Sequence, residues 1–260
     1  MTISQMNFIE QSAFFATLSN YAYKDINVFQ QQFPSYSVQY VSNNGADAYI
    51  LENTHDFIVV CRGTEVKQFS DIRADLGIAR TKMNNVKVHI GFNHYVDHIW
   101  DDILARGRHA CWHNKSVWLT GHSLGAAMAT IIAYRFALHT ALSTPTALFT
   151  YGSPRVGNKA FVDVTNALSY PHHRWVNDGD IITKIPFAPW FYHSGTMHHI
   201  DADGYVTPFY ERCSWSKYLL NLIKSHGLLR MLYQDAQDHS SDLYKNYLNL
   251  AEKFPILYND

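Results

Sequence analysis

One serine lies between two glycines in the segment Gly121-His122-Ser123-Leu124-Gly125. An apolar, β-branched run precedes this segment and an alanine-rich run follows it, as expected where a G-x-S-x-G turn joins a buried strand to a helix. Such a turn exposes the serine hydroxyl and directs the positive end of the helix at the same space. The pattern therefore predicts a nucleophilic serine at position 123, with the backbone amide of Leu124 as one oxyanion donor. A side chain at either glycine would collide with the neighbouring strand or helix.

A serine hydroxyl is a weak nucleophile unless a histidine acts as its base and a carboxylate fixes the histidine tautomer. Around this kind of turn the chain order is serine, acid, histidine. Two aspartates, Asp178 and Asp180, follow a predicted strand over residues 173–178. Asp178 precedes a glycine and is a good turn residue, which favours Asp180 as the acid. Position alone leaves His239 and His193 as alternatives for the base.

The second oxyanion donor should follow a strand that lies upstream of the serine. The apolar run over residues 57–64 ends in Arg62-Gly63-Thr64. Thr64 offers both an amide and a hydroxyl, so we expect it to be the second donor. The competing interpretation is that this tripeptide is only the exit of a strand.

The elements that position these groups follow from hydrophobic periodicity. Short apolar runs alternate with longer stretches of helical spacing, which is typical of a mostly parallel sheet with helices on both faces. In such sheets the functional residues follow the carboxyl ends of the strands. We expect one α/β domain over residues 1–260. The predicted strands are 36–41 and 47–52, which form a hairpin, and then 57–64, 86–92, 116–121, 146–152 and 173–178; the predicted helices are 5–18, 92–113, 124–139, one from about Asn158, 216–233 and 241–252.

The composition excludes several classes of protein. A net charge of −1 gives no basic surface for nucleic acid, and no apolar stretch of about 18 residues predicts a membrane span. No signal peptide is visible, so we expect a cytoplasmic protein or one exported by a non-conventional route. Three cysteines are too few and too widely spaced for a disulfide framework. Since His193, His198 and His199 do not have the spacing of a zinc motif, we expect no metal and no cofactor.

Five segments follow one another over about residues 57–186: FIVVCRGTE, VHIGF, LTGHSLGAAMA, FTYGSPRVGN and RWVNDGDIITKIP. Together, and in this order, they resemble the class 3 lipase family, the filamentous-fungal-type triacylglycerol lipases with their bacterial and plant relatives. The resemblance implies an α/β-hydrolase fold with a central, mostly parallel sheet and helices on both faces.

The resemblance also implies roles for particular residues. Ser123 corresponds to the nucleophile of the family, and Asp180, which opens a D-I-I step, corresponds to its acid. Thr64 follows R-G, as the oxyanion residue of the family does. His239 is favoured over His193 because bacterial members carry their histidine in a D-H-S segment near the C-terminus.

The resemblance implies hydrolysis of carboxylic esters through a Ser-Asp-His triad and an acyl-enzyme, with triacylglycerol as the first substrate class. A short-chain carboxylesterase, a feruloyl-type esterase and a phospholipase A1 are alternatives on the same fold. A catalytically inactive lipid-binding or interaction protein is the alternative from another class. We expect a lipid or other ester as the partner, with transient contact at a lipid–water interface, and the oligomeric state stays open.

Two apolar segments bear on the substrate. Within residues 65–83, Phe69, Ile72 and Leu76 fall on one face of a short helix, where the resemblance implies a lid. An ordinary surface helix is the equal alternative. Residues 185–191, IPFAPWF, follow the predicted acid and form either a wall for an acyl chain or a loop that packs on the core.

Overall fold

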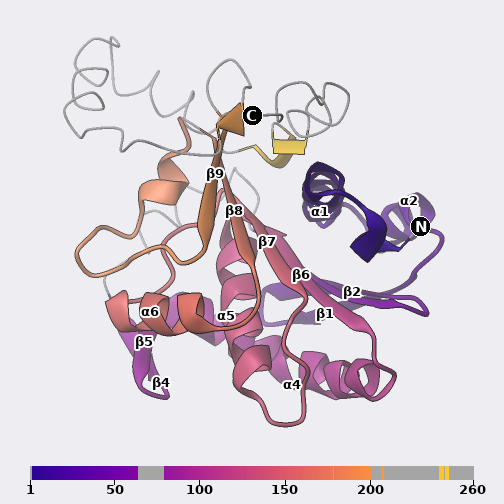
Figure 1. Cartoon of the computed structure of the whole chain (residues 1–260), viewed down its shortest axis with the longest axis horizontal. Coiled ribbons are helices and arrows are strands. Elements are labelled where there is room, and N and C mark those ends of the chain that lie inside the picture. Colours follow the sequence, from indigo (N-terminus) through magenta and orange to yellow (C-terminus); the bar gives the residue numbers. More distant parts are fainter. Residues whose placement is uncertain are drawn as a thin grey trace.

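The computed structural model describes residues 2–63, 79–177, 179–200, 206–207, 240–242 and 244–245 of the chain. Its described part contains one large sheet of eight strands in the order β1-β2-β3-β6-β7-β8-β9-β10 (Figure 1). Strands β3, β6, β7, β8 and β9 run parallel, and antiparallel strands close both edges. The strands are β1 (Ser37–Asn43), β2 (Ala46–Glu52), β3 (Asp56–Cys61), β6 (Ser116–His122), β7 (Ala147–Tyr151), β8 (His172–Asn177), β9 (Thr196–Ile200) and β10 (Val206–Thr207).

Helices cover both faces of this sheet, as the sequence predicts (Figure 1). One face packs on α1 (Phe8–Tyr21) and α2 (Ile26–Gln32), and the other packs on α4 (Ile90–Trp112), α5 (Leu124–Leu138) and α6 (Lys159–Ala167). Every residue of β3 and of β7 is buried, as expected for strands enclosed on two sides. None of the helices that the structure describes is long and apolar enough to cross a membrane.

Side-chain caps determine where two of these helices begin. The Asn7 side chain accepts hydrogen bonds from the amides of Ile9 and Glu10, so α1 begins three residues later than its apolar spacing predicts. Asn158 caps α6 by accepting the amide of Phe161 at 3.0 Å, which confirms the predicted start of that helix.

The predicted core strand at 86–92 is wrong in length and in place. Strand β5 (Val86–His89) pairs with β4 (Arg80–Met83) in a separate two-stranded sheet, and α4 begins directly after it. Lys87 is exposed between two buried valines. This alternation is typical of an antiparallel strand with one solvent-exposed face, whereas a central strand is buried on both faces.

Several predicted segments lie outside the described residues. Strand β4 occupies the last part of the predicted lid over 65–83, and the predicted lid helix falls within residues 64–78, which are not described. The predicted helix at 216–233 and most of the one at 241–252 also lie outside the described part of the chain.

Candidate active site

The turn at Ser123 has the geometry that its sequence predicts. Ser123 has φ 59° and ψ −126°, a conformation that costs a non-glycine residue free energy and that occurs mainly at functional sites. Its amide donates to the carbonyl of Tyr151 at 3.0 Å, and its own carbonyl accepts the amide of Ala126 at 3.0 Å at the start of α5. The peptide on either side of the serine is therefore fixed by β7 and by the helix.

Two glycines make this turn sterically possible. A Cβ atom at Gly121 would lie 2.4 Å from the carbonyl oxygen of Gly125 on α5. A Cβ atom at Gly125 would lie 2.2 Å from the carbonyl oxygen of Cys61 at the end of β3. Both obstacles are backbone atoms, which confirms that each glycine of the motif is required by a close approach of main chains.

The Ser123 side chain is buried, whereas the sequence predicts an exposed hydroxyl. Its exposed fraction is 0%. Among the residues that the structure describes, Oγ has no hydrogen-bond partner. A buried hydroxyl without a partner costs free energy, and at this position it leaves the oxygen available to a base.

Asp180 lies beyond the carboxyl end of β8 and is buried, with an exposed fraction of 0%. Its Oδ1 accepts the amide of Ile182 at 2.9 Å and caps the short helix η3 (Ile181–Lys184). Its Oδ2 accepts the hydroxyl of Tyr244 at 2.7 Å. Asp178, the other predicted acid, lies outside the described residues.

Tyr244 connects the C-terminal part of the chain to Asp180, the predicted acid. Its hydroxyl donates to Asp180 and accepts the amide of Asn177 at 2.9 Å, and its ring lies 5.9 Å from the ring of His122. Burial raises the pKa of Tyr244 well above its usual value, and the charge of Asp180 raises it further. Tyr244 is therefore protonated at neutral pH and serves as a donor to the carboxylate.

A second contact fastens the same segment to α1. Asn20 donates through Nδ2 to Asp242 Oδ1 at 2.8 Å and to Ser241 Oγ at 3.2 Å (Figure 1 shows the segment beside α1). The residues that directly follow His239 are thus held between α1 and Asp180. His239 itself and Thr64, the predicted second oxyanion donor, lie outside the described residues.

His193, the alternative base, is engaged by the backbone of the acid loop. Its Nε2 donates to the carbonyl of Thr183 at 2.6 Å. Burial lowers the pKa of His193 well below its usual value, and the nearby Arg174 and Arg155 lower it further. A histidine held neutral in this way supports the loop and is poorly suited to accept a proton from Ser123.

Two of the histidines considered as a metal site, His193 and His198, have different hydrogen-bond partners. His198 Nε2 lies 3.1 Å from His173 Nδ1, while His193 bonds the acid loop. Across the part of the chain that the structure describes, no group of three or more His, Cys, Asp or Glu residues is placed to hold a metal ion.

A tyrosine just after α1 reaches the Ser123 turn, which the sequence reasoning did not anticipate. The Tyr23 hydroxyl and His122 Nδ1 are 2.8 Å apart. Gly63 fits between them so closely that a Cβ atom there would lie 2.3 Å from this hydroxyl and 2.6 Å from the carbonyl oxygen of His122. The strand end that leads to Thr64 is therefore packed directly on the residue that precedes Ser123.

Arg155 explains the Pro-Arg step of the YGSPRVGN segment. Its guanidinium Nη1 donates to the carbonyls of Lys184 and Pro186, and its amide donates to the carbonyl of Ile185 at 2.8 Å. One arginine thus fixes the chain that leaves the Asp180 loop. The arginine of the YGSPRVGN segment therefore stabilises the loop after Asp180, a role that the sequence spacing alone did not show.

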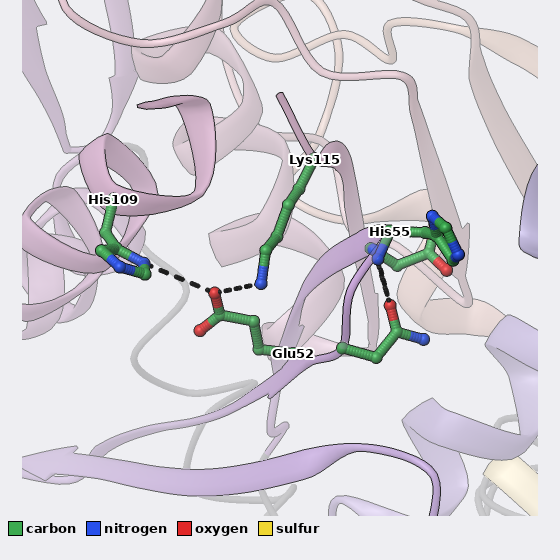
Figure 2. Close-up of polar contacts among 6 residues, drawn as sticks. Glu52, His55, His109 and Lys115 are labelled. Carbon is green, nitrogen blue, oxygen red and sulfur yellow. Dashed lines mark hydrogen bonds and ion pairs between the residues drawn. The ribbon is translucent and has the colours of Figure 1, made fainter. Parts of the chain in front are cut away.

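A polar cluster at the other end of the sheet has no part in this site. Glu52 accepts Lys115 Nζ at 2.6 Å and lies 3.6 Å from His109 Nδ1 (Figure 2). Lys115 directly precedes β6, so the cluster lies at the amino ends of the parallel strands, whereas Ser123 follows the carboxyl end of β6.

Comparison with known proteins places this site in a family. The profile described as lipase (class 3) matches residues 58–190, half of the chain. The chain therefore belongs to the class 3 lipase family, a family of serine ester hydrolases. The match contains the Ser123 turn and the Asp180 loop.

Individual relatives include both lipases and phospholipases. The chain is 32% identical over 123 residues to a lipase from Rhizomucor miehei, which covers 45% of this chain and 34% of that protein. It is 41% identical over 71 residues to phospholipase A(1) DAD1, chloroplastic, from Arabidopsis thaliana, which covers 27% of this chain and 16% of that protein. These matches span well under half the length of either relative.

A solved structure shares the fold over most of the chain. The triacylglyceride lipase of Rhizomucor miehei superposes with a TM-score of 0.70 at 22% identity, over 86% of this chain and 92% of that one. A triacylglycerol lipase whose catalytic centre is a serine protease triad superposes with a TM-score of 0.69 at 23% identity, over 89% and 92%. The predicted α/β-hydrolase fold is thereby confirmed.

Proposed function

We propose that this chain hydrolyses carboxylic esters with Ser123 as nucleophile, Asp180 as acid and His239 as base. The observation that carries the proposal is the contact of Tyr244 with Asp180, because it brings the segment that directly follows His239 to the acid loop. The strained backbone of Ser123, and an Oγ with no hydrogen-bond partner among the described residues, support the role of nucleophile.

In the proposed mechanism, Ser123 Oγ attacks the ester carbonyl while His239 takes the hydroxyl proton. The Leu124 amide and Thr64 stabilise the oxyanion, and each donor contributes about 3 kcal/mol to the barrier reduction. The alcohol then leaves with the proton from His239, and Ser123 carries the acyl group. Water, deprotonated by His239, attacks the acyl-enzyme and releases the acid and the free serine.

Burial of Ser123 adds a requirement to this mechanism. An exposed fraction of 0% means that an ester reaches Oγ only after some covering group moves. We propose that this movement is favoured at a lipid–water interface, as expected of a lipase rather than of an esterase with an open site.

The apolar loop after the acid supports a lipid-like substrate. Ile185 and Phe191 are buried, whereas Phe187 and Trp190 are exposed by 60% and 42%. Part of the loop therefore packs on the core, and part presents large apolar side chains to solvent, which is costly unless an apolar partner covers them. We propose triacylglycerol as the substrate, with the sn-1 ester of a phospholipid as the alternative that the plant relatives favour.

The test compares hydrolysis of a triacylglycerol and a phospholipid across the solubility limit, using wild-type protein and Ser123→Ala. We expect activity in the wild type alone, with a rise in rate when the triacylglycerol forms an emulsion. Smooth saturation on short or feruloyl esters indicates an esterase, and preference for the phospholipid indicates a phospholipase A1. Equal rates for both proteins contradict the enzyme assignment.

A matched pair of variants tests the role of the loop. Phe187→Ser with Trp190→Ser removes the two exposed side chains and should lower the rate on emulsion several-fold, with the rate on a soluble ester retained. Trp112→Ser removes a side chain that is 85% exposed at the end of α4, and it should change neither rate. Equal losses from both variants contradict contact between this loop and the lipid.

A further inference from the structure

Two histidines on the first turns of α4 face each other across one helical turn. His94 and His98 are four residues apart, their ring centroids are 4.2 Å apart, and their Nε2 atoms are 3.0 Å apart. His94 is exposed and His98 is half-buried. Two imidazole nitrogens thus converge on one point at the surface of the protein.

The separation of these nitrogens fits one type of metal coordination. At a bond length of about 2.1 Å, two ligands at 90° lie about 3.0 Å apart, whereas tetrahedral ligands lie about 3.4 Å apart. Tetragonal geometry with nitrogen ligands is typical of Ni²⁺ and Cu²⁺. We propose that His94 and His98 form a two-histidine site that binds Ni²⁺ or Cu²⁺ more tightly than Zn²⁺, with water in the remaining positions.

The β1–β2 turn packs against His98. Asn43 Nδ2 donates to the carbonyl of His98 at 2.9 Å, and Asn44 Nδ2 lies 3.4 Å from His98 Nδ1. Metal binding at Nε2 requires the proton on Nδ1, so the Asn44 amide must turn over and present its oxygen to the ring when a metal binds. The neighbouring Asp97 is already paired with Arg135 and is not needed as a ligand.

Two other histidine pairs lack either free, converging ring nitrogens or access to solvent. His109 and His113, at the C-terminal end of α4, have the same spacing and ring centroids 4.4 Å apart, but His109 Nδ1 is directed at Glu52 (Figure 2). His173 and His198 bring two nitrogens within 3.1 Å, but the rings of Phe8 and Trp175 pack on them and leave no place for a hydrated ion. Converging nitrogens and access to solvent therefore coincide at His94 and His98.

The test is calorimetric titration of the full, tag-free chain with NiCl₂, and then with ZnCl₂, near neutral pH. We compare the wild type with His94→Ala, His98→Ala and the matched control His109→Ala with His113→Ala. Loss of one of the two chelating ligands should raise the Kd for Ni²⁺ about tenfold or more. The control should keep the wild-type affinity, and wild-type protein should bind Zn²⁺ more weakly than Ni²⁺.

Both α4 variants change surface residues, and near-UV circular dichroism verifies their fold. Cu²⁺ electron paramagnetic resonance gives a second readout, because two coupled nitrogens in the wild type should become one in His94→Ala. An unchanged Ni²⁺ isotherm in His94→Ala and His98→Ala, or loss of the site in the control alone, overturns the proposal and leaves the pair as a hydrogen bond only.

Discussion

The hydroxyl of Tyr244 donates a hydrogen bond to Oδ2 of Asp180 over 2.7 Å, between residues 64 positions apart. The other carboxylate oxygen of Asp180 accepts the amide of Ile182. Both oxygens therefore have a fixed donor, and these two donors help to set the plane of the carboxylate. In a triad, the acid orients the base, so the donors on the acid determine how well that orientation is kept.

Tyr244→Phe tests whether this contact acts on catalysis. Loss of a hydrogen bond to a charged group should lower kcat about ten- to a hundredfold, with KM nearly unchanged. Tyr151→Phe is the control, since it removes a buried hydroxyl that donates to the carbonyl of Ser12. Steady-state kinetics on a soluble ester give both parameters, and equal kcat values for the two variants speak against a positioning role.

Substitution of the acid itself should have a larger effect. Asp180→Asn keeps the shape of the side chain but favours the wrong histidine tautomer, so we expect kcat to fall by about four orders of magnitude. Asp178→Asn should leave kcat within severalfold of the wild type. Comparable modest losses in both variants would identify the wrong aspartate as the acid.

Acid should destabilise the fold through buried histidines. Burial lowers the pKa of His172 to about 3, and its Nε2 lies 3.0 Å from Thr150 Oγ1. In the unfolded chain the pKa is about 6.5, so the stabilisation is fully present above that pH and is lost as the pH falls toward 3. One such group contributes a slope of up to about 1.4 kcal/mol per pH unit.

Urea unfolding at pH 7, 6, 5 and 4 measures this slope. His172→Gln should be less stable than the wild type at pH 7 and should lose stability less steeply below pH 6. The surface variant His55→Gln is the control. Parallel curves for the wild type and His172→Gln would exclude His172 as a source of the acid sensitivity.

Gly125, in the first turn of α5, should tolerate no side chain. A Cβ atom at Gly125 meets the carbonyl oxygen of Cys61 at 2.2 Å, so Gly125→Ala should lower the free energy of unfolding by about 3 kcal/mol or more. Gly91→Ala is the control, because its Cβ would approach only the His89 side chain, at 3.2 Å. A Gly125→Ala protein as stable as the control would contradict the steric account.

Local chemistry explains which predictions from the sequence are confirmed. Gly121 is required by its approach to Gly125, and the Asn158 cap requires only the amide of Phe161. Both depend on residues near in the chain, so a pattern a few residues long is enough. Alternation of fully buried strands with helices likewise predicts the parallel centre of the sheet.

Contacts between distant segments could not be predicted in this way. Tyr244 meets Asp180, and Tyr23 meets His122, only because the fold brings separate elements together. The end of β5 was misplaced because His89, which precedes α4, makes no side-chain cap that a sequence pattern would reveal. The predicted base His239 and oxyanion donor Thr64 stay predictions.

Covalent labelling of the nucleophile tests the central claim most directly. Wild-type protein treated with diethyl p-nitrophenyl phosphate should release about one equivalent of p-nitrophenol, lose esterase activity and carry a diethylphosphoryl group on Ser123 in the peptide mass spectrum. Ser123→Ala should take up no label, and His239→Ala should react far more slowly. Ester hydrolysis that survives in Ser123→Ala, or a label on another residue of the active wild type, would contradict the account.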